Sequence, residues 1–269
     1  MRMLENGVFE GKYTTSFTQT GMHDELTNKS FLLLMENLAE AHSSYCNFSF
    51  NDLAKENATW VILAWKLRVF KRPGANEKVK VQTWGRFFNK VYVLRDFKFF
   101  NDKGELCAIA TSKWCLLDTV KGRIAKMPEN LDKIYMAMPE ESVFNIKDLP
   151  RLFVPEGEPE DSDKYRIRRF DLDLNHHVHN LNYLNFAYEV IPMDVYMGEE
   201  LNNVEIAYKK EIKYGETVNS FLYVEDNKND NNQEFLKDGI NDDAENKIYT
   251  IVIKDESGEI VHSIVKLYN

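Results

Sequence analysis

The sequence contains little cysteine, and the few cysteines are not paired. Three cysteines, Cys46, Cys107 and Cys115, are scattered over 269 residues, and no Cys-x-x-Cys spacing occurs. An odd, scattered set argues against a disulfide framework or a cysteine-rich zinc site. We therefore interpret the cysteines as small core or surface residues of a reduced, cytoplasmic protein rather than as nucleophiles.

Long apolar runs and an excess of basic charge are also missing. The formal net charge is −9, whereas nucleic-acid binding needs a basic surface. No run approaches the ~18 apolar residues of a membrane span. The first residues also lack the apolar core of a signal peptide. We expect neither nucleic acid nor membrane as a partner. Hydrophobic residues make up 43% of the chain, enough for the core of one large domain or two ordinary ones.

The first half of the chain has one helical pattern among several strand patterns. Thr27 or Asn28 is suited to cap a helix whose apolar stripe includes Phe31, Met35 and Leu38. Residues rich in β-branched and aromatic types predict strands at 12–19, 57–69, 78–88, 90–100 and 105–118. This order favours an α+β fold in which an antiparallel sheet wraps around one long helix.

A proline-rich segment then separates two similar halves. Residues 127–163 hold five of the seven prolines, and we interpret them as a linker between domains at 1–126 and 164–269. At an offset of 152 residues, which aligns Tyr13 with Tyr165, Asn28 falls opposite Asn180. The consistent order of such matches indicates an internal duplication. The polar stretch 226–247 is predicted to be an insertion in the second half.

The most informative stretch is 170–192, FDLDLNHHVHNLNYLNFAYEVIP. Acids, an amide and histidines recur at every second position, at Asp171, Asp173, Asn175, His177 and His179. An extended segment would point these side chains to one face. Leu184, Ala187 and Ile191 then form an apolar helical stripe that Pro192 ends. We expect backbone N–H groups near 177–180, at this helix start, to bind a carbonyl oxygen.

Each of these residues also has a structural explanation when taken singly. Asp173 or Asn175 is suited to cap a helix or form an Asx turn, and His177 to make a structural hydrogen bond. The three histidines, with Asp173 as a fourth ligand, are an alternative zinc site. Glu211, in a Lys-Lys-Glu-Ile-Lys run, has the alternative of an ordinary solvated charge. The first half lacks this polar group at the aligned positions, which favours chemistry in the second half.

At these residues the sequence resembles the acyl-carrier-protein thioesterases of plants and bacteria. The family signature reads approximately D-L-D-x-N-x-H-V-N-N-x-x-Y, and residues 171–183 read DLDLNHHVHNLNY. His179 stands where the family usually has Asn. The resemblance extends over nearly the whole chain except 226–247, through Trp60-Val61, Arg72-Pro73, 81–84, 110–114, 123–128 and 208–211.

The resemblance implies a tandem (double) hot-dog fold and hydrolysis of fatty acyl-[acyl-carrier-protein] without a cofactor or metal. It implies a catalytic group of Asp173, Asn175, His177 and Glu211. Plant members often carry Cys directly after that Glu; Ile212 stands here, which excludes a cysteine nucleophile at that position. Asp173 or Glu211 would activate water while Asn175 and His177 orient it, and which carboxylate is the base stays open.

Two further sets of residues are expected to bind the substrate. The resemblance suggests that core residues of the first half line an acyl tunnel, at Met35, Leu38, Trp60, Trp65 and Trp84. Because a carrier protein is acidic, basic residues near the signature are predicted to dock it. These are Arg166, Arg168, Arg169, Lys209, Lys210 and Lys213. A solvated charged face is the alternative. A chain that already contains two halves is expected to be a monomer or a homodimer.

Three rival functions remain open on the sequence alone. A thioesterase of the same fold acting on coenzyme A thioesters would carry the same signature. A non-enzymatic acyl-binding protein would not need Asp173, Asn175, His177 and Glu211 together. A dehydratase or hydratase on this scaffold would have a different His/Asp arrangement.

Overall fold

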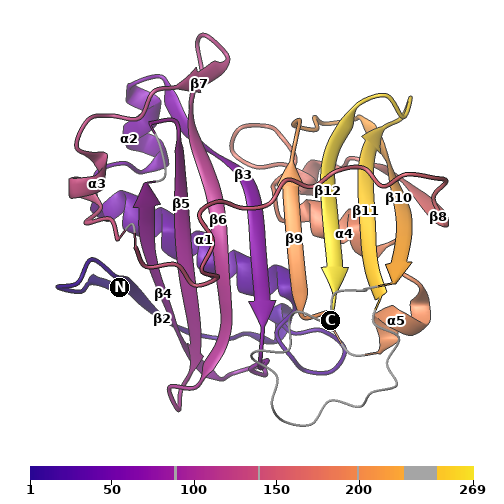
Figure 1. Ribbon diagram of the computed structural model, residues 1–269, viewed down its shortest axis with the longest axis horizontal. Coiled ribbons are helices and arrows are strands. Elements are labelled where there is room, and N and C mark those ends of the chain that lie inside the picture. The colour runs from indigo at the N-terminus through magenta and orange to yellow at the C-terminus, as the bar shows by residue number, and fades with distance from the viewer. Residues whose placement is uncertain (88–89, 139, 199, 227–246) are drawn as a thin grey trace.

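The computed structural model describes residues 1–87, 90–138, 140–198, 200–226 and 247–269 (Figure 1). Within these residues the strands form one antiparallel sheet. The strands are β1 (Arg2–Met3), β2 (Phe9–Thr14), β3 (Ala58–Val69), β4 (Lys78–Phe87), β5 (Tyr92–Asn101), β6 (Leu106–Asp118), β7 (Arg123–Ala125), β8 (Asp161–Arg166), β9 (Asn203–Tyr208), β10 (Thr217–Asp226), β11 (Lys247–Asp255) and β12 (Val261–Tyr268). The helices are α1 (Asn28–Tyr45), α2 (Phe50–Lys55), α3 (Leu131–Ile134), α4 (Asn182–Tyr188) and α5 (Met193–Met197), with 3₁₀ turns at Phe17–Gln19 and Arg169–Asp171.

The sheet is built twice from the same strand order. The first half runs β2-β4-β5-β6-β3 and the second runs β8-β10-β11-β12-β9, so corresponding strands take corresponding places. The halves meet where β3 pairs antiparallel with β9, with Ala64 opposite Ala207. The predicted duplication is therefore visible as a repeated topology. The predicted insertion at 226–247 lies outside the described residues, apart from its two end positions.

Helix α1 covers the sheet of the first half and begins as the sequence predicts. The Thr27 side chain accepts a hydrogen bond from the Ser30 N–H and caps the helix, which then runs for 18 residues. Its buried face includes Phe31, Met35 and Leu38, which are fully enclosed. Apolar burial on this scale is the main favourable contribution to folding.

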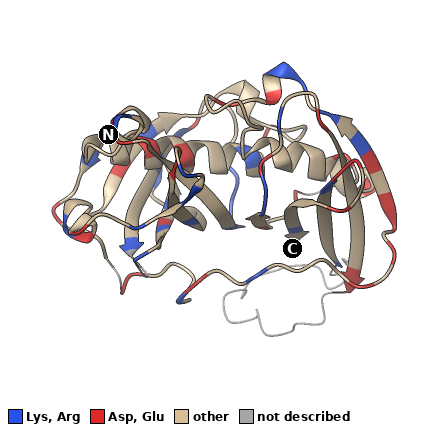
Figure 2. Ribbon diagram, turned by 90° about the horizontal axis from the view of Figure 1, so that it is seen from above, with Lys and Arg blue, Asp and Glu red and all other residues tan. Residues whose placement is uncertain are grey.

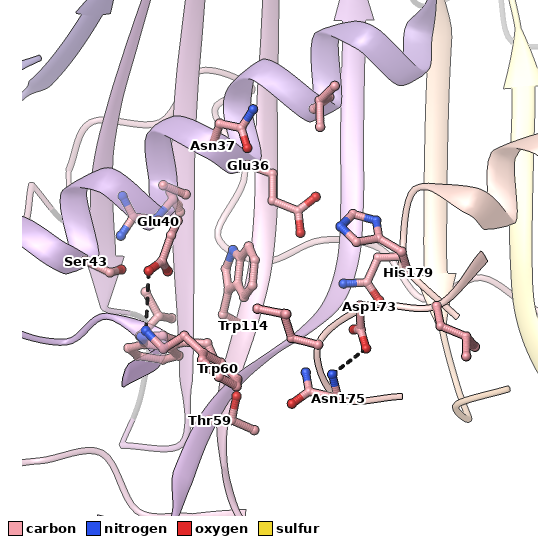
Figure 3. Close-up of a pocket in the computed structure, with 18 of the residues that line it drawn as sticks. Glu36, Asn37, Glu40, Ser43, Thr59, Trp60, Trp114, Asp173, Asn175 and His179 are labelled. Atoms are coloured by element: carbon pink, nitrogen blue, oxygen red, sulfur yellow. Dashed lines mark hydrogen bonds between the residues drawn. The ribbon is translucent and has the colours of Figure 1, made fainter. Parts of the chain in front are cut away.

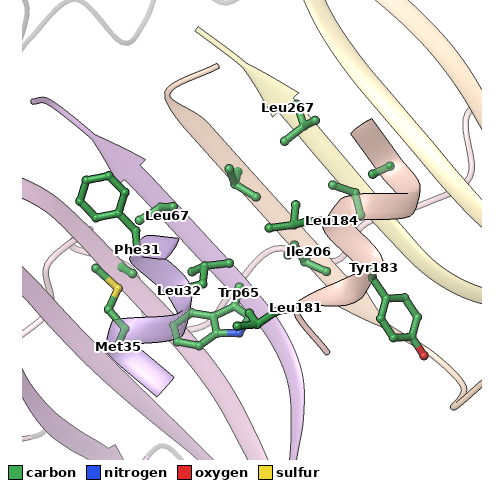
Figure 4. Packing of buried hydrophobic residues seen from close by; sticks show 14 of the residues in the cluster. Phe31, Leu32, Met35, Trp65, Leu67, Leu181, Tyr183, Leu184, Ile206 and Leu267 are labelled. Carbon is green, nitrogen blue, oxygen red and sulfur yellow. The ribbon is translucent and has the colours of Figure 1, made fainter. Parts of the chain in front are cut away.

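Among the described residues of the second half, no helix is as long as α1, so the long helix expected there is shorter than predicted. Helix α4 ends at Tyr188, three residues before the end of the predicted stripe, and α5 begins after Pro192. Proline disfavours the helical conformation in the residue that precedes it, which shortens the run. Leu181 and Leu184 still pack against Ile206 and Leu267 in the same core as α1 (Figure 4).

The segment between the halves crosses the sheet on the face opposite α1 (Figure 2). Trp84 Nε1 donates to the Glu141 carbonyl over 2.9 Å, and Lys113 pairs with Asp148 at 2.7 Å. Leu152 then packs on the second half beside Ala207 and Tyr223. The linker therefore contacts both halves on the face of the sheet opposite α1 and connects them there. Strand β8 begins at Asp161, just inside the predicted linker, and the exact domain boundaries stay a prediction.

Candidate active site

A cavity of about 610 Å³ lies between α1 and the segment 172–180 (Figure 3). Residues of both halves line it, so neither half forms it alone. The lining residues from the first half include Glu36, Asn37, Glu40, Ser43, Thr59, Trp60, Arg95 and Trp114. Those from the second half are Leu172, Asp173, Leu174, Asn175, His179 and Asn180. The cavity therefore joins the signature segment to the helix of the other half.

The signature segment is a tight turn rather than an extended strand. Asp173 Oδ1 accepts hydrogen bonds from the N–H groups of Asn175, at 2.8 Å, and His177, at 3.2 Å. His176 takes a left-handed conformation, with φ of 61°. Because of this Asx turn, side chains at alternate positions no longer point in the same direction. The expected shared face is therefore wrong: Asp173, Asn175 and His179 line the cavity, whereas Asp171 and His177 do not.

Two of the four predicted catalytic residues lie outside the cavity wall. His177 is half-buried, and its backbone forms an isolated antiparallel β-bridge with that of Lys213. Glu211 is exposed. Both Asp173 and Glu211 are within electrostatic reach of the Tyr183 hydroxyl. Burial, and then these charges, raise the pKa of Tyr183 above its ordinary range. Asp173 and Glu211 thus lie near the same tyrosine, but of the four predicted residues only Asp173 and Asn175 line the cavity.

Three of the four backbone N–H groups expected to bind a carbonyl oxygen are already used within the protein. The N–H of His177 donates to Asp173, that of Val178 to the Ile212 carbonyl and that of His179 to the Asp171 carbonyl. Helix α4 also starts only at Asn182. The expectation therefore fails at 177–179, and the N–H of the cavity residue Asn180 and side-chain donors remain for this role.

His179 is a cavity residue that the predicted catalytic set omits. Its Nδ1 accepts a hydrogen bond from the Leu181 N–H over 3.3 Å, which leaves the ring proton on Nε2. Burial lowers the pKa of His179, although Asp173 acts in the opposite sense. The ring is therefore a neutral hydrogen-bond donor beside Asp173 (Figure 3). The departure from Asn at this position was the sequence signal.

Glu36 is a second residue that sequence reasoning missed. It stands on a row of α1 whose other members, Leu32, Ala39 and Ser43, are buried. The residue is half-buried, but its Oε2 atom is shielded and has no hydrogen-bond partner among the described residues. Burial, and then the charge of Asp173, raise the pKa of Glu36 to about 7. An acid within an apolar row at three- and four-residue spacing was the available signal.

The predicted acyl-pocket residues are divided among three locations. Trp60 lines the cavity, and so does Trp114, which was not predicted. Met35, Leu38 and Trp65 belong to the enclosed core instead, with Trp65 packed on Phe97 at 5.3 Å between ring centroids. Trp84 lies on the opposite face of the sheet, under the linker. We therefore do not place these four residues in the cavity wall.

The wall farther along α1 is polar, which the sequence did not suggest. Arg95 is 5% exposed, and its Nη1 donates to His42 Nδ1 over 2.9 Å. Glu40 accepts from the Phe50 N–H over 3.3 Å, and Tyr135 stands over the Arg95 guanidinium. The cavity thus has carboxylates at one part of its wall and a buried cation at another.

Cysteines and metal ligands are not features of this site. All three cysteines are buried free thiols, and burial raises the pKa of Cys115 to about 11, which disfavours its thiolate. No group of three or more His, Cys, Asp or Glu side chains within the described ranges is arranged to hold a metal ion. Nor does any helix of the described chain have the length and apolar character needed to cross a membrane.

The six predicted docking residues are all exposed on the second half. Arg166, Arg168 and Arg169 line a surface groove of about 480 Å³ together with Tyr214. Lys209, Lys210 and Lys213 flank Glu211. Two apolar side chains of the same region are unusually exposed, Phe170 at 100% and Leu174 at 81%. Leu174 also lines the cavity, so the apolar surface reaches the cavity wall.

The repeated sheet-and-helix unit, with a cavity lined by residues of both halves, defines a tandem hot-dog protein. The family model "Acyl-ACP thioesterase N-terminal domain" matches residues 6–135, and "Acyl-ACP thioesterase C-terminal domain" matches 156–259. The chain therefore belongs to the acyl-ACP thioesterase family.

Known relatives and solved structures are similar to this chain. Oleoyl-acyl carrier protein thioesterase 2, chloroplastic, of Arabidopsis thaliana is 25% identical over 242 residues, covering 81% of this chain and 64% of the relative. The chain thus spans less than two thirds of that relative's length. The solved acyl-ACP thioesterase of Bacteroides thetaiotaomicron aligns with a TM-score of 0.80 at 20% identity, over 98% of both chains. The 12:0-ACP thioesterase of Umbellularia californica gives 0.78 at 18% identity, over 98% of this chain and 94% of that one. These likenesses confirm the predicted fold.

Proposed function

We propose that this protein hydrolyses the thioester of fatty acyl-[acyl-carrier-protein] and releases free fatty acid and carrier protein. The single observation that carries the proposal is the cavity that brings the signature residues Asp173 and Asn175 against α1. A thioester at Asp173 would place its acyl chain along the helix, toward Trp60 and Trp114. Family membership supports the same activity.

Asp173 is our choice for the general base. It lines the cavity, whereas Glu211 is exposed and does not. Two backbone N–H groups fix its Oδ1 atom, which leaves Oδ2 to take a proton from the attacking water. The Nε2–H of His179 and the amide of Asn175 are the donors that would bind the developing oxyanion. His177 acts by holding the turn, through its N–H and carbonyl bonds to Asp173.

The carrier protein would dock on the basic groove and the exposed apolar residues beside it. Arg166, Arg168 and Arg169 supply positive charge for an acidic partner, and Phe170 and Leu174 supply apolar contact. The phosphopantetheine arm would then enter beside Leu174. Lys209, Lys210 and Lys213 would extend the positive surface around Glu211.

The assembly and the location of the protein are part of the same proposal. The β3–β9 pairing already supplies within one chain the junction of two hot-dog units, which fits a monomer or a homodimer. Three buried free thiols fit a reducing compartment, such as the cytoplasm.

The test is thiol release from a chain-length series of acyl-carrier-protein thioesters, beside the same series on coenzyme A. Wild type is compared with Asp173→Asn, because Asn keeps an oxygen acceptor for the turn and removes the base. Turnover on the carrier series that falls by about 100-fold or more in the variant supports the proposal. Preference for coenzyme A would keep the chemistry and change the partner, and no turnover on either series would favour an acyl-binding protein.

A further inference from the structure

Glu36 is a carboxyl group of the first half that faces the reacting end of the cavity. It projects from α1 toward the segment that carries Asp173 and His179 (Figure 3). Its Oε2 atom is shielded from solvent and receives no hydrogen bond within the described part of the chain. A buried carboxyl oxygen without a partner is unfavourable in the free protein. Glu36 also lines the cavity, so its other oxygen, Oε1, is the one that would contact a substrate there.

The groups around Glu36 come from several elements. Asp173 acts on Glu36 electrostatically from the signature turn, and His179 stands beside it as a neutral donor. Tyr208, on β9, interacts electrostatically with Glu36, and its hydroxyl donates a hydrogen bond to the Asn180 carbonyl over 3.0 Å. Glu40 lies one turn farther along the helix, and the Arg95 cation lies on the same cavity wall.

We propose that Glu36 is the acid–base partner of Asp173, contributed to the reaction by the half that lacks the signature. The proposal rests on the hydrolysis proposed above. Asp173 takes one proton from water as the water oxygen bonds to the thioester carbon. Protonated Glu36 gives its proton to the departing sulfur as the carbon–sulfur bond breaks. The products are a carboxylic acid and a thiol, and the proton on Asp173 returns to Glu36 or to solvent.

The surroundings of Glu36 suit this role. With a pKa raised to about 7 by burial and by Asp173, the carboxyl group is mostly protonated below neutral pH and about half protonated at pH 7. A donor whose pKa lies near the working pH is the most effective general acid. A free thiol has a pKa of about 8.5, so transfer from Glu36 to an alkyl thiolate is favourable.

The decisive experiment varies the leaving group and the pH together. Acyl thioesters of an alkyl thiol, carried on the carrier protein or on pantetheine, are compared with an aryl thioester, whose more acidic thiol needs no proton to leave. Wild type is compared with Glu36→Gln and with the matched control Glu40→Gln, from the same helix and cavity. Glu36→Asp keeps the acid on a shorter side chain and checks that loss of activity is not loss of fold.

The expected result is specific to proton donation. Glu36→Gln should lower kcat for the alkyl thioester by about 100-fold and remove the fall of kcat above pH 7, while the aryl thioester should lose less than about 5-fold. Glu40→Gln should keep the wild-type pH profile of kcat. Glu36→Asp should still show a fall of kcat at high pH, because it keeps an ionisable carboxyl group. Equal losses on both leaving groups, or an unchanged pH profile in Glu36→Gln, would overturn the role of Glu36 and leave hydrolysis standing. Wild type without activity on any thioester would overturn both proposals.

Discussion

Arg95 and His42 form a buried pair in which the guanidinium donates to the neutral imidazole. The Nη1–Nδ1 distance is 2.9 Å, and the His42 ring stacks on Phe9 with 4.9 Å between centroids. Burial, and then the charge of Arg95, lower the pKa of His42 to about 2, so the ring stays an acceptor at neutral pH. The pair fixes a positive charge in the cavity wall, behind the part that holds Glu40.

Loss of this acceptor is expected to destabilise the protein. His42→Phe keeps the stacked ring but leaves the Arg95 N–H without its partner, at a cost of about 1–3 kcal/mol in the free energy of unfolding. Chemical denaturation gives this value. In a double-mutant cycle with Arg95→Met, the second substitution should recover part of the loss. Strictly additive effects would show that the pair makes no energetic contribution.

The raised pKa of Glu36 predicts a pH-dependent stability. The folded state holds this proton between pH 4.5 and about 7, where the unfolded chain releases it. The free energy of unfolding therefore falls as pH rises through this window, by at most about 3 kcal/mol from this group. The Glu36→Gln variant lacks this pH-dependent contribution to the free energy of unfolding. Its stability relative to wild type should therefore rise between pH 4.5 and pH 8. Denaturation at both pH values measures it, and a constant difference would contradict the assigned pKa.

The width of the cavity at Trp60 is expected to limit the acyl chain. Trp60→Ala removes a large side chain from the wall and should shift the released fatty acids toward longer chains. Chromatography of products from a mixed acyl-carrier pool measures the shift. Trp84→Phe is the matched control because Trp84 lies on the other face of the sheet. A comparable shift in both variants would argue for a general loosening instead.

Charge reversal in the basic groove should affect the carrier-bound substrate selectively. Arg168→Glu with Arg169→Glu is expected to raise KM for acyl carrier protein by about 10-fold or more, and the defect should shrink as salt increases. KM for a short acyl-pantetheine thioester should stay within about 2-fold. Lys121→Glu provides the distant control, because Lys121 lies in the first half, where it pairs with Asp118. Equal effects on both substrates would contradict docking at this groove.

Exposed Phe170 offers an apolar test of the same surface. Phe170→Ala removes a side chain that is 100% exposed, so the stability of the protein should change by less than about 0.5 kcal/mol. KM for the carrier-bound substrate should rise several-fold, with kcat on acyl-pantetheine unchanged. A loss of stability with no change in KM would assign Phe170 a structural role.

The features that sequence patterns predicted are local or repeated along the chain. Thr27 was a good cap candidate because capping involves residues only three positions apart, and the strands of the first half showed β-branched and aromatic runs. The repeated strand order agrees with the predicted duplication, but the order itself was not predicted. Even so, the short α4 was not predicted, because its apolar stripe continued beyond Tyr188 while the helix did not.

The features that escaped prediction depend on faces and distant contacts. Trp60 and Trp84 look alike in sequence, yet they lie on different faces of the sheet. His177 and His179 were expected on one face, but only His179 lines the cavity because the Asp173 carboxylate folds the backbone into a turn. Glu36 could not be connected to Asp173 because the two residues are far apart in the chain and come from different halves.

The contact between Asn28 and Tyr188 closes the place where symmetry would put a second site. At the offset of 152 residues, Glu36 corresponds to Tyr188 and Asn180 corresponds to Asn28. Glu36 and Asn180 face an open cavity, whereas Asn28 Nδ2 donates to the Tyr188 hydroxyl over 2.8 Å and to the Leu201 carbonyl over 2.7 Å. The two halves thus differ at equivalent positions: Glu36 and Asn180 line a cavity, whereas Tyr188 and Asn28 are joined by a hydrogen bond. If the proposed function holds, the expected stoichiometry is one acyl group for each chain.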